Sequence, residues 1–208
     1  MTVVRPIGTR ELAAIAAVHR LAFPDRGLSL LGDEAVRRYY DWQLTGPHDS
    51  VALGAFDGPA LVGFCVAGVF RGAMSGFLRT NRAFLARRLV TRPGLLADVV
   101  VRDRARRAIG GLARRRPRTV AAPAGGASFG ILAVAVAPAC RRRGVGRQLV
   151  AAVEDVARAR GFDRIGLTVD AGNDAAIRFY EALGWVRTPA GSAWSGRMER
   201  SIDAPRPT

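Results

Sequence analysis

Hydrophobic positions divide the first 70 residues into helical and extended segments. Apolar side chains recur every three or four residues in two stretches, which is typical of helices that pack one face, and they cluster or alternate in three others, which is typical of strands. In chain order the pattern predicts a strand at residues 2–6, a helix at 10–22 with Thr9 as its N-cap, a helix at about 32–44, and strands at 50–56 and 61–70 joined by a tight turn.

The last 80 residues carry a second series of elements. In chain order the pattern predicts a strand at 131–136, a basic glycine-containing turn, a helix at 147–160, a strand at 164–169, and a short helix whose apolar side chains fall at 176, 179, 180 and 183. Gly184 is placed to end that last helix.

A segment of different composition, residues 71–127, lies between the two series. Phe77 to Val90 and Leu95 to Leu112 are amphipathic and predict two helices, which a Pro- and Gly-rich connector follows. The segment carries 14 arginines against Asp98 and Asp103, a net charge of +12 out of +15 for the whole chain, which contains no lysine. We therefore expect a basic helical insertion.

Length and composition fit one globular unit with that insertion. A chain of 208 residues that is 49% hydrophobic can bury a sizeable core. No run of about 18 apolar residues predicts a membrane span, and no signal peptide is recognisable. Cys65 and Cys140 are far apart in sequence, and His19 and His48 are the only histidines. We therefore expect no metal centre, and a reduced, cytoplasmic location.

The most informative chemistry lies in the basic turn, Val136-Ala-Pro-Ala-Cys-Arg-Arg-Arg-Gly-Val-Gly146. A strand–turn–helix arrangement directs unpaired backbone N–H groups and the positive end of a helix dipole at a ligand over the turn. Glycines allow a close approach and arginines suit phosphate oxygens, so the turn predicts a diphosphate ligand. It has neither the Gly-Lys-Ser/Thr of a Walker A loop nor the third glycine of a dinucleotide-binding fingerprint.

Two linked motifs extend this prediction. The turn contains Arg141-x-x-Gly144-x-Gly146, and residues 173–185 contain Asn-x-x-Ala-x-x-Phe-Tyr-x-x-x-Gly-Trp. In this order and spacing they resemble the two hallmarks of the GNAT N-acetyltransferase superfamily, with Trp185 in place of a usual Phe. The resemblance covers residues 128–202 well and 1–70 loosely, and it does not cover the insertion.

The resemblance implies an α/β GNAT fold. Its sheet would be mixed but mostly antiparallel, with six or seven strands flanked by helices, and the Arg-rich insertion would lie between the third and fourth strands. We expect residues 1–202 to form a single acetyltransferase domain and 203–208 a tail. A homodimer is expected from the resemblance alone.

The resemblance also implies a site for acetyl-CoA. The pantetheine arm would pair with the backbone of Val134, Ala135 and Val136, the diphosphate would lie on the N–H groups of Arg142, Arg143, Gly144, Val145, Gly146 and Arg147, and Arg141, Asn173, Ala176 and Tyr180 would complete the contacts. An amine would attack the thioester directly, and Tyr180 would protonate the departing thiolate. A phenol suits that role because its pKa near 10 keeps it protonated at neutral pH.

Several assignments stay open at this stage. Tyr180 could instead be a core aromatic, and Asn173 could be a plain helix cap. No carboxylate lies in residues 128–132, where many relatives place a basic glutamate. The general base could be Asp33, Glu34, His19 or a water chain, or the reaction could need none.

The resemblance implies that the acceptor is a primary amine of a small molecule or a protein. The charge of the insertion favours an anionic acceptor, such as a nucleotide-linked amino sugar, with Asp33, Glu34, Arg102 and Arg106 as candidate contacts. Alternatively, the insertion is a solvated basic surface or docks on anionic lipid. Few aromatic residues and no recognition motif argue against nucleic acid. The rival of a different class is a catalytically silent acyl-CoA-binding module whose insertion docks on a membrane or nucleic acid.

Overall fold

The computed structural model describes residues 2–25, 27–91, 128–188 and 194–202. Its centre is one seven-stranded sheet with the order β1-β2-β3-β4-β5-β7-β6. The strands are β1 (Thr2–Pro6), β2 (Asp49–Asp57), β3 (Ala60–Val69), β4 (Phe129–Val136), β5 (Arg164–Thr168), β6 (Val186–Arg187) and β7 (Arg197–Ser201). All neighbours pair antiparallel except β4 and β5, which are parallel. The predicted mixed, mostly antiparallel sheet is confirmed.

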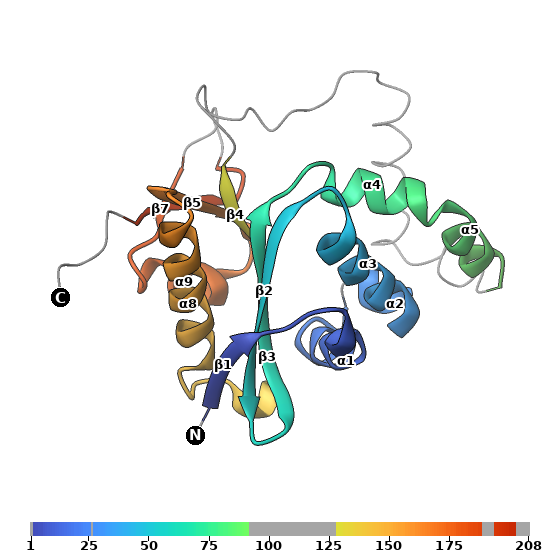
Figure 1. Cartoon of the computed structure of the whole chain (residues 1–208), viewed down its shortest axis with the longest axis horizontal. Helices are drawn as coiled ribbons and strands as arrows, with labels where there is room; N and C mark the ends of the chain where they lie inside the picture. Colours follow the sequence, from blue (N-terminus) through green and yellow to red (C-terminus); the bar gives the residue numbers. More distant parts are fainter. Residues whose placement is uncertain (1, 26, 92–127, 189–193, 203–208) are drawn as a thin grey trace.

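Helices cover both faces of this sheet (Figure 1). They are α1 (Leu12–Ala22), α2 (Gly27–Leu30), α3 (Asp33–Thr45), α4 (Ala73–Thr80), α5 (Arg82–Thr91), α8 (Val145–Ala159) and α9 (Asp174–Glu181), with 3-10 turns η1 (Thr9–Glu11) and η2 (Pro138–Cys140). In Figure 1, α1 to α5 lie to one side of β2 and β3, and α8 and α9 lie to the other.

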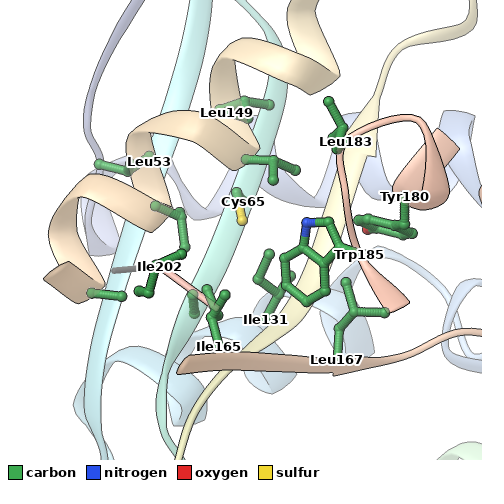
Figure 2. Packing of buried hydrophobic residues seen from close by; sticks show 14 of the residues in the cluster. Leu53, Cys65, Ile131, Leu149, Ile165, Leu167, Tyr180, Leu183, Trp185 and Ile202 are labelled. Atoms are coloured by element: carbon green, nitrogen blue, oxygen red, sulfur yellow. The ribbon is translucent and has the colours of Figure 1, made fainter. Parts of the chain in front are cut away.

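The sheet separates two hydrophobic clusters. The larger one packs α8 and α9 on the sheet and includes Cys65, Leu149 and Trp185, all less than 3% exposed (Figure 2). The other packs α1 and α3 on the opposite face around Tyr40 and Phe64. Successive side chains of a strand point to opposite sides of the sheet, so the same strands contribute residues to both clusters.

β4 changes phase once along its length. Its register with β3 shifts between Val66 and Ala67, so that Leu132 has no partner in the pairing. Ile131 and Val134 therefore pack in the same cluster although they are three residues apart. A bulge of this kind is often found next to a functional site, because it re-aims the side chains and backbone that follow.

Two local predictions need correction. Thr9 is not the N-cap of the first helix; it lies inside η1, and the Gly8 N–H donates to the Glu11 carboxylate at 2.9 Å. This hydrogen bond satisfies an N–H group at the start of the helix that has no partner within it, so no cap from Thr9 is needed. Between the two predicted helices at 10–22 and about 32–44, where no element was predicted, lies the short helix α2.

The first part of the insertion also differs from its prediction. Residues 77–90 were expected to form one helix, but α4 and α5 are separate and meet at Asn81. The Asn81 side-chain amide donates to the Phe77 backbone carbonyl at 3.1 Å, and the Asn81 backbone carbonyl accepts from the Leu85 N–H at 2.9 Å. Asn81 therefore ends one helix and begins the next. The expected helix at 95–112, the connector, and Arg102 and Arg106 lie outside the described residues.

None of the helices that the structure describes is long and apolar enough to cross a membrane.

Candidate active site

The sheet opens between β4 and β5. These parallel strands pair only from Phe129 to Ile131, opposite residues 165–167. β4 continues to Val136 on β3 alone. The second half of β4 thus has one edge without a strand partner among the described residues, facing the gap toward β5.

The direction of the β4 backbone follows from one hydrogen bond. The Ala137 N–H donates to Val62 O at 2.9 Å, toward β3. Backbone groups alternate in direction along an antiparallel pair, so Ala135 also points toward β3, while Val134 and Val136 point their N–H and C=O groups into the gap. An extended ligand can add to this edge as a strand would.

The turn after β4 presents further donors. Gly144 has φ +79° and caps α8, and Arg142 is also left-handed at φ +61°. A β-carbon at Gly144 would meet nothing within 4 Å, so glycine is favoured here for backbone conformation alone. In the described part of the chain no backbone carbonyl accepts from the N–H groups of residues 142–147. These donors, at the positive end of a 15-residue helix, fit a diphosphate.

Gly146 has a different role from Gly144. A β-carbon there would lie 3.3 Å from the Phe179 ring and 3.9 Å from Val136. The glycine therefore lets α9 approach the first turn of α8 closely. This contact joins the two sequence motifs physically, because Phe179 belongs to the second and Gly146 to the first.

The arginines of the turn differ in their contacts. Arg141 donates to two backbone carbonyls, Val136 O at 3.4 Å and Ala22 O at 3.2 Å. Arg143 lies 3.5 Å from the Asp57 carboxylate. Arg142 and Arg147 make no ion pair with any described residue and are exposed, so their charge is available to a ligand.

α9 positions Tyr180 and the residues around it. Asn173 caps this helix: its side-chain oxygen accepts from the Ala176 N–H at 3.1 Å. Ala176 packs on the larger cluster, and Gly184, at φ +82°, follows the helix end.

Tyr180 lies at the edge of the larger cluster and is 8% exposed. Its ring packs edge-on against Phe179 and against Trp185, the second of which is seen in Figure 2. Burial, with a smaller effect from Cys65, raises the pKa of its hydroxyl above the ordinary value. Among the described residues, none forms a hydrogen bond with that hydroxyl. The phenol is therefore protonated at neutral pH, and no described residue accepts its proton.

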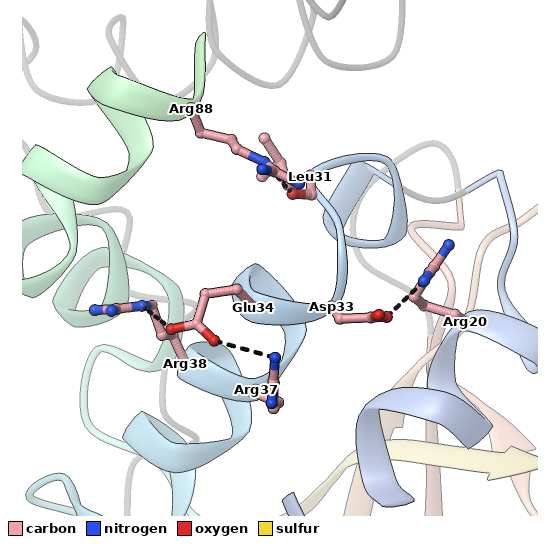
Figure 3. A network of polar contacts seen from close by, with 7 residues as sticks. All are labelled: Arg20, Leu31, Asp33, Glu34, Arg37, Arg38 and Arg88. Carbon is pink, nitrogen blue, oxygen red and sulfur yellow. Dashed lines mark hydrogen bonds and ion pairs between the residues drawn. The ribbon is translucent and has the colours of Figure 1, made fainter. Parts of the chain in front are cut away.

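The predicted carboxylates Asp33 and Glu34 lie in the first turn of α3, where both face arginine side chains (Figure 3). Asp33 accepts from Arg20 at 2.5 Å, and Glu34 accepts from Arg38 at 2.7 Å. Asp33 lines a depression of about 650 Å³ between α1, α2 and α3. Ser29 lines the same depression, and its hydroxyl is buried without a partner among the described residues.

His19 is a core residue. It is 7% exposed, and its Nδ1 lies 2.9 Å from the Tyr40 hydroxyl. Burial lowers the pKa of His19 to about 4. A neutral, weakly basic imidazole is a poor general base at neutral pH.

Several residues around the site were not predicted. Arg88 donates to Leu31 O at 2.9 Å, which fixes α5 to the turn before α3 (Figure 3). Arg20, Ser29 and Arg88 belong to no motif, and Arg88 and Leu31 are 57 residues apart, so no local sequence signal could have found this contact. The described residues also contain no group of three or more His, Cys, Asp or Glu side chains placed to hold a metal ion.

Solved structures show the same fold. A GNAT-family acetyltransferase from Desulfovibrio desulfuricans superposes with a TM-score of 0.60 at 12% identity, over 98% of this chain and 100% of the other. The PaiA N-acetyltransferase from Thermoplasma acidophilum, solved with coenzyme A, gives 0.57 at 13% identity, over 97% and 99%. The ribosomal-protein-S18-alanine N-acetyltransferase from Escherichia coli gives 0.57 at 16% identity, over 99% and 97%.

Two curated relatives match parts of the chain. The mycothiol acetyltransferase of Renibacterium salmoninarum is 40% identical over 36% of this chain, and that of Thermobispora bispora is 44% identical over 27%. The matches span only 22% and 19% of those proteins' lengths. The acetyltransferase (GNAT) family model matches residues 13–185. The chain therefore belongs to the GNAT acetyltransferase family, whose acyl donor is acetyl-CoA.

Proposed function

We propose that this protein transfers an acetyl group from acetyl-CoA to a primary amine. The observation that carries the proposal is the free edge of β4, which ends at a turn rich in N–H donors. The free edge of β4 suits the amide-bearing pantetheine arm, and the turn that follows β4 suits the diphosphate. The two halves of acetyl-CoA thus have complementary surfaces that are continuous along the chain.

The chemistry follows from the backbone and one side chain. The Val136 N–H, directed into the gap, polarises the thioester carbonyl and stabilises the oxyanion that forms when the amine attacks. Tyr180 then gives its proton to the departing thiolate. Burial keeps this hydroxyl protonated at neutral pH, so its proton is present when the thiolate forms.

Among the described residues, no candidate base is placed to remove a proton from the amine. Asp33 and Glu34 are paired with arginines, and His19 is buried and weakly basic. The amine is therefore expected to enter in its neutral form, or to lose its proton to water after attack. The same observation favours the second candidate function, a catalytically silent acyl-CoA-binding module.

The acceptor is proposed to be a small amine with an anionic group. α4 and α5 are fixed to α3 by Arg88, by Phe77, which is 1% exposed, and by Gln43, whose side chain donates to Ala73 O at 3.1 Å. The basic insertion thus begins beside the helices that line the depression at Asp33. Two partial relatives are named mycothiol acetyltransferases, which makes the amine precursor of mycothiol one candidate.

The test is release of free CoA thiol from acetyl-CoA across a panel of primary amines, including amino sugars with and without phosphate. Acetylation of at least one amine, faster with the anionic member of a pair, supports the proposal. If the protein binds CoA but acetylates no amine, the silent module is favoured. Arg102→Gln and Arg106→Gln then serve as a second test, because they should raise the KM of an anionic acceptor and leave that of its neutral analogue unchanged.

A further inference from the structure

One guanidinium joins the two sides of the site. Arg141 follows η2, where its own N–H donates to Pro138 O at 3.2 Å and so fixes the start of the side chain. Its Nη2 donates to Ala22 O at 3.2 Å, and its Nε donates to Val136 O at 3.4 Å. Ala22 is the last residue of α1, and Val136 is the last residue of β4.

The Ala22 contact has a physical reason. The last carbonyls of a helix lack partners inside the helix and carry the negative end of its dipole. Arginine offers several donors in a rigid plane, so one side chain can serve two carbonyls at once. The first arginine of the Arg-x-x-Gly-x-Gly motif is therefore engaged with protein carbonyls, while the phosphate donors of the turn are backbone N–H groups.

The end of α1 is also a wall of the depression beside α3. Ala17, Arg20, Leu21 and Pro24 line it. Arg20 crosses it to Asp33. A change in the position of the cofactor turn can thus reach this wall through a single side chain, because Arg141 belongs to the turn and Ala22 to the wall's helix.

We propose that Arg141 is a positioning residue that couples the cofactor turn to the C-terminal end of α1. When the turn closes on the diphosphate, the guanidinium holds the last turn of α1 and the segment after it in place, so that cofactor binding orders the α1–α2 wall. The inference rests on the proposed function, since it needs the turn to bind CoA. If bound CoA changes the affinity of the depression for a ligand, that ligand must by linkage change the affinity for CoA by the same factor.

Hydrogen exchange with and without saturating CoA tests this coupling without an acceptor. In the natural protein, CoA should slow exchange in peptides covering residues 142–149 and also in peptides covering 19–25. The effect at the second segment should be on the order of threefold or more, because a frayed helix end opens easily. In Arg141→Gln at saturating CoA, exchange should still be slowed in 142–149, but the slowing at 19–25 should be lost.

Two further variants sharpen the test. Arg141→Lys keeps the charge but places a single ammonium where two carbonyls are now served, so it should restore the effect only in part. Arg10→Gln removes an equal charge from an exposed residue of η1 and should behave like the natural protein.

The outcomes are distinct. If CoA protects 19–25 equally in Arg141→Gln, or protects only 142–149 in the natural protein, the coupling is wrong while the proposed function stands. If Arg141→Gln chiefly raises the Kd for CoA by more than about tenfold, the side chain binds phosphate and the coupling is again wrong. If the natural protein does not bind CoA at all, both proposals fail.

Discussion

At the scale of single residues, the same chemical group takes different roles according to its hydrogen-bond partners. Tyr40 and Tyr180 are both buried phenols with raised pKa values. The Tyr40 hydroxyl is held by His19, whereas that of Tyr180 has no described partner. A proton that is already engaged is harder to transfer, so Tyr180 is the better candidate for the acid.

Tyr180→Phe is expected to lower kcat by at least about 100-fold, because general acid catalysis typically contributes 10²- to 10⁴-fold. The Kd for CoA should change less than about twofold, since the ring and its packing remain. Steady-state kinetics with calorimetric CoA binding checks both. A silent module would show no such effect, and unchanged kcat would remove Tyr180 from the mechanism.

His19 predicts a pH dependence of stability. Its pKa is about 4 in the folded protein and about 6.5 in an unfolded chain, so between these values the unfolded state binds more protons. The contribution of His19 to the free energy of unfolding should be complete above pH 6.5. It should be lost as the pH drops toward 4, which lowers the free energy of unfolding by up to about 3 kcal/mol. Urea unfolding at pH 4.5, 5.5 and 7 measures this.

His19→Gln should flatten that pH dependence. His48→Gln is the matched control: burial lowers the pKa of His48 as well, but this ring is only half-buried, so its removal should flatten the curve less. An equal pH dependence in His19→Gln and the natural protein would contradict the assignment.

At the scale of elements, the turn before α8 separates two kinds of glycine. Gly144 needs a left-handed backbone and has free space around it, whereas Gly146 is helical and lies against Phe179. The spacing Gly-x-Gly alone could not tell these apart, because one constraint is a dihedral angle and the other is a contact with a residue 33 positions away.

Gly144→Ala should destabilise the fold by about 1 kcal/mol, the cost of a β-carbon in a left-handed conformation. Gly144→Asn should cost less, because asparagine tolerates that region. Gly146→Ala carries no backbone cost but displaces the Phe179 ring, so it should change the packing of α9 and lower kcat with little loss of stability. Thermal unfolding and kinetics of the three variants check this, and equal costs for Gly144→Ala and Gly144→Asn would argue against a dihedral constraint.

Most elements were predictable because their signals are local. Periodicity located β1 to β5 and the helices α1, α3, α8 and α9 to within a few residues, but no pattern located β6 or β7. The resemblance supplied the mixed, mostly antiparallel character of the sheet. The break at Asn81 was missed because a tertiary contact supports it: Arg38 on α3 donates to the Asn81 side chain at 3.5 Å. Thr9 was wrongly predicted as a cap because the neighbouring Glu11 carboxylate accepts from the Gly8 N–H instead. For the candidate site, the turn and α9 carry motifs, whereas the Arg141–Ala22 contact joins residues that no pattern relates.

At the scale of the whole molecule, the insertion begins as part of the body of the protein. Phe77 packs edge-on against Tyr39, and a β-carbon at Gly76 would collide with the Trp42 ring. These contacts build α4 onto α3 without any space between them. The role of the remaining insertion residues as an acceptor lid stays a prediction.

Phe77→Ala should therefore destabilise the protein by about 3 kcal/mol, the usual cost of removing a buried phenylalanine ring. Phe84→Ala removes a half-buried ring that stacks on Arg38 and should cost about 1 kcal/mol. Urea unfolding of both compares them directly. Equal, small costs would mean that α4 is not part of the cooperative unit.

The most direct test of the central claim is calorimetric titration of the natural protein with acetyl-CoA, desulfo-CoA and ATP. The free β4 edge and the N–H-rich turn together predict binding of acetyl-CoA and desulfo-CoA with Kd values on the order of micromolar, and no comparable binding of ATP, which lacks the pantetheine arm. Equal affinity for all three would mean that the turn binds phosphate without the β4 edge. No binding of acetyl-CoA would contradict the proposed function itself.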